Sequence, residues 1–390
     1  MSGVISTFAT IPIMNKRTLI ICIMLLSGVM IGSKSIAQNG RSLDIVLCMD
    51  LSASTNGLIE DLKERVWEIA SEASKLDPVP NLRIALIAYS RPSYGKTTFY
   101  VKMMQNLTDD LDRFADTLIQ IHPAIEAGDQ YVGRAIITCI NDITWSKDAN
   151  ALKLVFLVGN GTVDLGGNEY EKATIYAETK GILIFPLFCK TYNNPATMAG
   201  WKKIAELAHT EYNEITVNKH PLQIKTDFDE DVIAELNKEL RATYVPYGPL
   251  GRKRFYLQED LDKYAAAFNN LSYLARITVK SSTAYQFKNS SWDLVDLAFN
   301  TEVDYSKLER IFLPIEIRDY PDDKLKEYIE KKKTVRNKVV STMKTMNGLR
   351  LKELQTKRKD LRVNENGTLG NVVINMMKKY AAQNGFSVPK

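Results

Sequence analysis

The chain has 390 residues, of which 45% are hydrophobic and 25% charged, with 20 glycines and 13 prolines. This composition excludes collagen-like, low-complexity and wholly disordered proteins, and the length suits a domain of about 200 residues with a smaller module. The net charge of +5 is unevenly placed: residues 324–362 carry 14 Lys and Arg against 4 Asp and Glu, whereas residues 38–323 are net acidic. An acidic body with a basic tail argues against a nucleic-acid-binding core, so we expect no nucleic-acid partner.

The N-terminus has the organisation of an export signal. A basic pair, Lys16-Arg17, precedes the apolar run from Leu19 to Gly32, and Ser35-Ile36-Ala37 stands directly before Gln38. These three parts are typical of a cleavable signal peptide, here residues 1–37. The apolar run is shorter than the roughly 20 residues that a membrane span needs, although an uncleaved membrane anchor is the alternative. The sequence therefore predicts an exported protein that is periplasmic, associated with the cell envelope or secreted.

Three cysteines lie beyond this segment, namely Cys48, Cys139 and Cys189. An odd number of cysteines cannot form a complete set of disulfides. Each lies in an apolar run, which favours buried free thiols over the alternative of one internal disulfide.

From residue 42 onward, apolar runs alternate with stretches of helical periodicity. The runs predict buried strands at 43–49, 82–89, 98–104, 152–158 and 181–189. The periodicity predicts helices that begin near residues 58 and 111, and further helices at about 132–144, 169–179, 198–209 and 226–243. Strands separated by helices indicate an α/β domain over residues 42–245 with a doubly wound, mostly parallel sheet. The close spacing of the second and third strands indicates one antiparallel edge strand.

Beyond Tyr244 the pattern changes to that of a mostly helical module over residues 246–390. Gly248, Gly251 and the basic run at 252–254 predict a linker. A helix at 257–279, a helical hairpin over 322–361 that turns at Asn347-Gly348, and a final amphipathic helix at 368–383 are predicted to follow.

The end of the first strand carries the one motif with a clear chemical meaning. Asp50 ends the strand, and Ser52 and Ser54 follow at a spacing of two. Loops at the carboxyl ends of strands form the ligand crevice of α/β sheets, so one carboxylate and two hydroxyls can meet there. Such hard oxygens suit Mg²⁺, Ca²⁺ or Mn²⁺. The alternative is that Asp50 and Ser52 only cap the helix that follows.

The motif Asp50-x-Ser52-x-Ser54 and the order of the strands resemble the von Willebrand factor A domain and its metal-ion-dependent adhesion site, over about residues 42–245. Segments 240–248 and 290–296 also resemble parts of exported bacterial proteins that carry this domain and a C-terminal helical extension. The resemblance implies that Asp50, Ser52 and Ser54 hold a divalent cation directly.

Two further loops depart from the family pattern. Where the family has a Thr before a helix, this chain has Asp129, or Gln130 in the alternative alignment, and where the family has an Asp before a Gly, it has Asn160. Asn160 keeps a carbonyl oxygen but loses a charge, whereas Asp129 adds a carboxylate, so the total charge of the site need not fall. The resemblance then implies Asp129 as a direct or water-bridged ligand and Asn160 as a residue that orients the ligands.

The function that the resemblance implies is metal-dependent binding of another protein, in adhesion or assembly, without enzymatic activity. Mg²⁺ is the expected cofactor, with Ca²⁺ or Mn²⁺ as alternatives, and an acidic group of the protein partner completes the coordination of the ion. One alternative is a metal-dependent hydrolase, which needs a general base beside the ion. Another is a structural scaffold with a degenerate metal site.

Two other patterns in the sequence have a functional and a structural interpretation. The basic runs Lys331–Lys333 and Lys357–Lys359 admit three interpretations: a solvated helical face, docking onto the acidic body, or contact with an anionic envelope surface. Ser90–Thr97 resembles a phosphate-binding loop, but a strand-like segment follows it where such a loop needs a helix.

Overall fold

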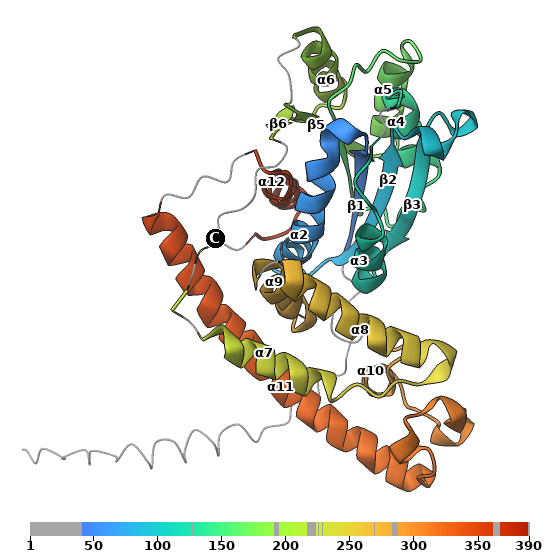
Figure 1. Cartoon of the computed structure of the whole chain (residues 1–390), viewed down its shortest axis with the longest axis vertical. Helices are drawn as coiled ribbons and strands as arrows, with labels where there is room; N and C mark the ends of the chain where they lie inside the picture. The colour runs from blue at the N-terminus through green and yellow to red at the C-terminus, as the bar shows by residue number, and fades with distance from the viewer. Residues whose placement is uncertain are drawn as a thin grey trace, which may run out of the picture. The chain divides into compact units, whose positions relative to one another are not determined.

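The computed structural model (Figure 1) describes residues 41–390, apart from residues 126–127, 191–194, 217–223, 225, 228, 269, 283–287, 362–366 and 389–390. The predicted signal peptide, residues 1–37, lies outside the described residues. Among the described residues, no helix has the length and apolar character that crossing a membrane requires.

A six-stranded sheet forms the centre of the α/β part, in the order β3-β2-β1-β4-β5-β6. Every neighbouring pair is parallel except β2 and β3, which are antiparallel. Strand β1 is buried along its whole length, as expected for a continuous apolar run in a sheet that is covered on both faces. The prediction of a doubly wound, mostly parallel sheet is therefore confirmed. The strands are β1 Ser42–Asp50, β2 Asn81–Tyr89, β3 Val101–Thr108, β4 Leu152–Gly159, β5 Ile182–Cys189 and β6 Asn213–Ile215.

The third strand begins later than predicted. The prediction of a strand at 98–104 is wrong at its start because two short 3₁₀ helices, Pro92–Tyr94 and Lys96–Thr98, occupy the preceding loop. Phe99 and Tyr100 then adopt positive φ angles of 55° and 57°, which a strand does not allow. The short polar strand β6 has no apolar run and was not predicted.

Helices cover both faces of the sheet (Figure 1). Alternate residues of β1 point into two separate apolar cores, one shared with α2, α3 and α12 and the other with α4, α5 and α6. The three cysteines are buried free thiols in these cores, as predicted. These helices are α2 Asn56–Ala73, α3 Leu111–Ile119, α4 Val132–Asn141, α5 Glu169–Thr179, α6 Pro195–Leu207 and α12 Leu369–Gln383.

The last helix belongs to the core of the α/β part. Helix α12 lies beside α2 (Figure 1), and Tyr380 on α12 makes an edge-to-face contact with Phe185 on β5, with ring centroids 4.7 Å apart. After α12 the chain pairs with the segment before β2, because Asp77 N donates to Ser387 O at 3.0 Å. The helical residues between β6 and α12 are therefore an insertion into the α/β part, whereas the sequence placed α12 in a separate module after residue 245.

The described residues of the inserted module form five helices and three short 3₁₀ helices. The predicted linker near residues 248–254 is wrong, because α8 begins at Gly248, and the predicted helix at 257–279 is divided between α8 and α9. The basic run there lies on a helix, where Arg254 pairs with Asp110 at 2.9 Å. The elements are α7 Glu230–Arg241, α8 Gly248–Phe268, α9 Asn270–Lys280, α10 Leu294–Asn300, the 3₁₀ helices Tyr305–Lys307, Arg310–Phe312 and Ile315–Ile317, and α11 Asp322–Asp360.

Helix α11 is one continuous helix of 39 residues, so the predicted hairpin at Asn347-Gly348 is wrong. Its buried positions recur every three or four residues from Arg336 to Leu354, and polar residues occupy three of them: Arg336, Asn347 and Arg350. Asn347 donates to Ser281 Oγ at 3.3 Å. A Cβ at Gly348 would meet nothing within 4 Å, so this glycine marks neither a turn nor a close packing contact.

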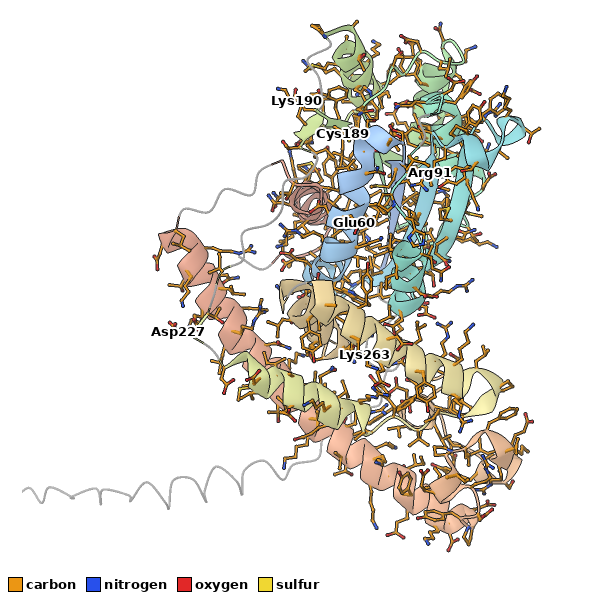
Figure 2. The ribbon with its side chains drawn as sticks, in the orientation of Figure 1. Glu60, Arg91, Cys189, Lys190, Asp227 and Lys263 are labelled. Atoms are coloured by element: carbon orange, nitrogen blue, oxygen red, sulfur yellow. The ribbon has the colours of Figure 1, made fainter. Side chains whose placement is uncertain are left out.

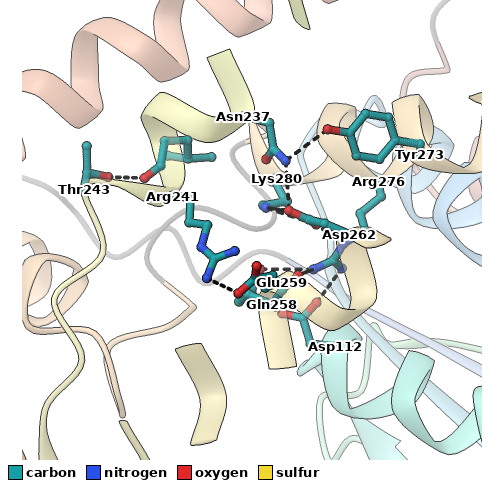
Figure 3. Close-up of polar contacts among 11 residues, drawn as sticks. Asp112, Asn237, Arg241, Thr243, Gln258, Glu259, Asp262, Tyr273, Arg276 and Lys280 are labelled. Carbon is teal, nitrogen blue, oxygen red and sulfur yellow. Dashed lines mark hydrogen bonds and ion pairs between the residues drawn. The ribbon is translucent and has the colours of Figure 1, made fainter. Parts of the chain in front are cut away.

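A buried ionic network joins the module to the α/β part (Figure 3). Arg276 on α9 pairs with Asp112 on α3 at 2.5 Å and with Asp262 on α8 at 2.6 Å. The guanidinium of Arg276 is fully buried and lies 4.4 Å from the ring centroid of Trp67 on α2. Lys280 also pairs with Asp262 at 2.9 Å. Although burial alone would raise the pKa of Asp262, Lys280 and Arg276 outweigh it and lower that pKa.

A second buried pair of carboxylates organises the other end of the module. Asp293 accepts from Val245 N at 2.8 Å and caps α10 through Val295 N and Asp296 N. Arg336 of α11 pairs with both Asp293 and Asp296. Segments 240–248 and 290–296 are the two that resemble parts of exported bacterial proteins. In the structure they contact each other, and the second of them pairs with Arg336 of α11.

Candidate metal-binding site

The candidate site lies where the winding of the sheet changes direction. Strands β1 and β4 are neighbours, yet the chain leaves β1 toward β2 on one side and leaves β4 toward β5 on the other. A crevice at the carboxyl ends of two such strands is the usual ligand site of an open α/β sheet. Asp50 ends β1, Asn160 follows β4 directly, and Ser90 follows β2 directly.

Asp50 is fully buried and only half satisfied. Its Oδ1 accepts a hydrogen bond from Ser52 N at 2.9 Å. Its Oδ2 is buried without a hydrogen-bond partner among the described residues. Burial raises the pKa of Asp50 to about 6, although Ser52, the Ser90 side chain and the Asn160 backbone all favour the ionised form. A buried carboxylate oxygen without a partner is costly for the fold, and a bound cation would relieve that cost.

The two serines of the motif face each other. Ser52 Oγ lies 3.1 Å from Ser54 Oγ. The hydroxyl of Thr55 donates to Asp50 O at 2.8 Å and so stabilises the turn that follows β1. Neither Ser52 nor Thr55, which precede the two helical segments after β1, caps its helix through its side chain. The capping alternative therefore does not account for the Ser52 hydroxyl.

The loop after β4 contributes Asn160, and the loop before α4 contributes Gln130. Asn160 Nδ2 donates to Ser54 Oγ at 3.0 Å, and Gln130 Nε2 lies 3.3 Å from Asn160 Oδ1. Gln130 Oε1 is buried without a partner among the described residues. A Cβ at Gly161 would lie 1.7 Å from that oxygen, so only glycine leaves room for the Gln130 amide. The structure thus places the alternative residue, Gln130, beside Asn160.

Asp129 does not contact the other proposed ligands. Its side chain is exposed, and among the hydrogen bonds and ion pairs of the described residues none joins it to Asp50, Ser52, Ser54 or Asn160. The structure therefore brings together four of the five residues proposed from the sequence and leaves Asp129 outside this group of contacts.

Two residues of the site were not recognised in the sequence. Ser90 is fully buried with a φ of 74°, and its hydroxyl has no partner among the described residues. Arg91 ties two loops together, because it donates to Leu51 O at 2.7 Å and to His122 O at 2.8 Å (Figure 2). The signal that could have found Ser90 is its position directly after the strand next to β1, since parallel strands end at the same edge of a sheet.

Aromatic side chains lie at the rim of the site. Phe99 and Tyr131 make an edge-to-face contact with ring centroids 5.3 Å apart, and Arg134 lies 4.3 Å from the Phe99 ring. Each ring is connected to a residue of the site. The backbone next to Phe99 is held by Ser90, whose N donates to Tyr100 O at 3.0 Å, and Tyr131 directly follows Gln130 in the sequence.

The oxygen atoms that meet here fit a hard divalent cation. They comprise one buried carboxylate, three serine hydroxyls and two side-chain amides, and three of their atoms are buried without a partner among the described residues. Among the described residues, no group of three or more His, Cys, Asp or Glu side chains could hold a metal. The oxygen atoms of Asp50, Ser52 and Ser54 are of the kind that Mg²⁺, Ca²⁺ or Mn²⁺ prefer, and the donor set carries little negative charge.

Comparison of the sequence with family models and with curated proteins finds no match. Solved structures with similar folds include proximal thread matrix protein 1 from the mussel byssus with a zinc-occupied MIDAS motif (15% identity, TM-score 0.36, 46% of this chain and 42% of that chain). An aerotolerance-related membrane protein from Bacteroides fragilis matches at 16% identity with a TM-score of 0.31, over 45% of this chain and 92% of that chain. Manganese-loaded TRAP protein from Plasmodium vivax matches at 13% identity with a TM-score of 0.32, over 46% and 70%. This chain spans less than half the length of the mussel protein, and such identities concern the fold alone.

The class of domain follows from the chain's own topology. A sheet of order 3-2-1-4-5-6 with one antiparallel edge strand, and an Asp-x-Ser-x-Ser motif at the end of its first strand, define a von Willebrand factor A-type fold. The α/β part of this protein therefore has this fold with a helical insertion, and it is called the A-type domain below.

Proposed function

We propose that this protein binds another protein through a divalent cation held at the edge of its A-type domain, and that it is not an enzyme. The observation that carries the proposal is the buried, half-satisfied carboxylate of Asp50 beside the unpartnered oxygens of Ser90 and Gln130. Such a group of atoms costs stability in the absence of a ligand, so it is best explained by a ligand that the site has been built to hold.

In this proposal Asp50, Ser52 and Ser54 hold the ion, and Mg²⁺ is the expected one. Asn160 and Gln130 orient these oxygens, while Asp129 contributes only through water or through its charge. A dication beside the single carboxylate of Asp50 keeps a net positive charge, and an acidic side chain of the partner would neutralise it. The exposed Ser54 hydroxyl lies on the side from which that acid would approach.

The aromatic rim gives the partner a second contact. Phe99 is more than one third exposed, at 37%, and Ile125 in the loop after α3 is fully exposed. The positive φ angles of Phe99 and Tyr100 each carry a conformational cost, which is typical of segments held in place for binding. We propose that apolar side chains next to the partner's acidic group pack on this rim.

The competing functions make different demands on the site. A metal-dependent hydrolase needs a general base beside the ion, whereas the described side chains around Asp50 are serines and amides. A scaffold with a degenerate site would show no dependence on divalent ions at all.

Export of the protein is part of the same proposal, whereas the basic residues of α11 bear on its contact with the cell envelope. The basic residues of α11 are largely engaged within the chain: Lys331 pairs with Glu327 at 2.7 Å, Lys332 donates to Ala242 O at 2.7 Å and Lys357 pairs with Asp227 at 3.0 Å. These contacts support the solvated-face and docking interpretations of the basic runs more than contact with an envelope surface.

Titration of Mn²⁺ into two single variants decides which residue of the second loop serves the ion. Gln130→Ala should weaken Mn²⁺ binding by about 10- to 100-fold, because it removes a residue that orients the ligands. Asp129→Ala is the matched control and should change the affinity by less than about threefold. Isothermal calorimetry measures both. The reverse order would restore Asp129 as the ligand, and the absence of binding by the unmodified protein would exclude the metal site.

A carboxylate probe tests the proposed coordination by the partner. Bound Mn²⁺ with open coordination positions enhances the relaxation of water protons. Addition of glutarate should reduce this enhancement as its carboxylate replaces bound water. Glutaramide has the same length without the charge and serves as the control. An enhancement that glutarate leaves unchanged would contradict the role of an acidic partner group while leaving ion binding intact.

A further inference from the structure

One face of helix α11 is turned toward solvent along most of the helix. Its positions follow one another at alternating intervals of four and three residues, so they lie above one another on one side of the helix. We call this face the α11 stripe, and it extends for about 30 Å. Its residues are Lys331, Val335, Lys338, Thr342, Thr345, Leu349 and Lys352.

The α11 stripe is both basic and apolar. Residues 331–352 contain eight Lys and Arg and no Asp or Glu. Val335 is 47% exposed and Leu349 is 57% exposed. Lys338 and Lys352 have no acidic partner among the described residues. Exposed apolar side chains next to unpaired positive charges are typical of a surface that binds an acidic protein.

A groove of about 430 Å³ lies on one side of the stripe, between α11 and the end of α7, which runs beside it (Figure 1). Val335 and Tyr328 supply apolar surface to this groove, and Lys331 and Lys332 supply positive charge. Among the described residues one acid, Glu239, also lines it. The groove therefore has room for an apolar side chain and lysines that can meet an acid beside that side chain.

The opposite combination, acidic and apolar, occurs at the end of the module where α11 begins. We call residues 302–323 the module tip, and they contain seven Asp and Glu against three Lys and Arg. Two of these cations are already paired, Lys307 with Asp304 at 2.9 Å and Arg310 with Asp322. Five exposed acids of the tip have no cationic partner among the described residues: Glu302, Glu309, Glu316, Asp319 and Asp323.

Two isoleucines project from the module tip. Ile311 is 64% exposed and Ile315 is 72% exposed, and they lie on the last two 3₁₀ helices before α11. Their neighbours Leu313 and Ile317 are buried in an apolar core with Leu325 of α11. The tip is therefore held on the first turns of α11, and it presents the two isoleucines beside unpaired acids.

The module tip does not cover the stripe of its own chain. Val335 and Leu349 stay exposed in the same molecule in which Ile311 and Ile315 stay exposed. Helix α11 is continuous, and Leu349 lies about 40 Å along it from Asp322, the residue to which the tip is paired. A contact between the tip and the full length of the stripe therefore needs two molecules.

We propose that this protein associates with a second copy of itself, and that the module tip of one copy lies on the α11 stripe of the other. The unpaired acids of the tip meet Lys338 and Lys352, while Ile311 and Ile315 pack on Leu349 and in the groove beside it. Because the two surfaces differ, each pair keeps one free tip and one free stripe, so further copies can join head to tail. The association needs no divalent ion and is independent of the proposed metal site.

Sedimentation velocity in EDTA tests the proposal. The unmodified protein should associate as its concentration rises, and more weakly at about 1 M than at about 0.1 M salt, because salt screens exposed charges. Leu349→Glu adds an acid to the stripe and Ile315→Lys adds a base to the tip, so each should weaken association at least about tenfold. Ile175→Glu is the control: it changes a 48% exposed residue of α5 and should leave the association within about twofold.

A mixture of the two variants gives the sharpest test. Leu349→Glu keeps a native tip and Ile315→Lys keeps a native stripe, so pairs should form in the mixture although neither variant associates alone. Failure of the mixture to form pairs, or association that both single variants retain, would overturn the proposal. So would an unmodified protein that stays monomeric up to roughly 0.1 mM. A monomer that instead co-sediments with phosphatidylglycerol vesicles would assign the stripe to a lipid surface.

Discussion

Asp50→Asn is expected to abolish binding of divalent ions and, at the same time, to stabilise the ion-free protein above pH 7. The folded protein holds the pKa of Asp50 at about 6, against an ordinary value of 3.8, because the carboxyl is buried. Folding therefore favours the protonated form of this group. Its contribution is fully present below about pH 4 and is lost as the pH rises through 6.

The size of the effect follows from the shift in pKa. A difference of about two pKa units corresponds to roughly 3 kcal/mol, and solvent relaxation reduces this, so a gain of about 1–3 kcal/mol is expected at pH 8. Urea unfolding in EDTA measures the free energy of unfolding at pH 5 and pH 8, and the gain should be larger at pH 8. Asp129→Asn makes the same change of charge at an exposed position and should leave the free energy of unfolding within about 0.5 kcal/mol. Retained ion binding in Asp50→Asn would contradict the assignment of this ligand.

Arg276→Met should destabilise the protein more than any other single change considered. Arg276 is fully buried between Asp112 and Asp262, and its removal takes a buried positive charge away from both carboxylates (Figure 3). Loss of one member of a buried ionic network costs about 3–5 kcal/mol, because a charge is left unpaired away from water. Methionine keeps most of the volume, so the change isolates the effect of the charge.

Urea unfolding at pH 7 measures this loss, with Lys263→Met as the control. Lys263 lies on α8 and pairs with Glu259 at 2.9 Å, but its side chain is 68% exposed (Figure 2). An exposed pair contributes less than about 1 kcal/mol. Equal losses of stability in the two variants would show that the buried network does not hold the module to the A-type domain.

The sequence predicted the α/β part well because its strands are long apolar runs. Residues such as those of β1 are buried on both faces, and a run of this kind is readable from local pattern alone. The same local reasoning failed on α11. There Arg336, Asn347 and Arg350 occupy buried positions, and their polarity hides an apolar stripe that is otherwise continuous. Which surface covers each of them depends on residues far away in the sequence.

The candidate site likewise contains residues that local sequence predicts and residues that it does not. The spacing of Asp50, Ser52 and Ser54 is local, and the structure brings their side chains together as the spacing implies. The choice between Asp129 and Gln130 is not local, because it depends on which side chain of a loop faces Asn160. In the sequence Ser90 stands only at the start of a segment that resembles a phosphate-binding loop, and the pairing of β1 with β2 is what places it in the site.

The place of α12 has a consequence for the order in which the chain can fold. The face of α2 and the ring of Phe185 are covered by α12, which follows them by well over a hundred residues. During synthesis the core of the A-type domain stays incomplete until the residues of α12 have left the ribosome. Contacts so distant in sequence also slow folding.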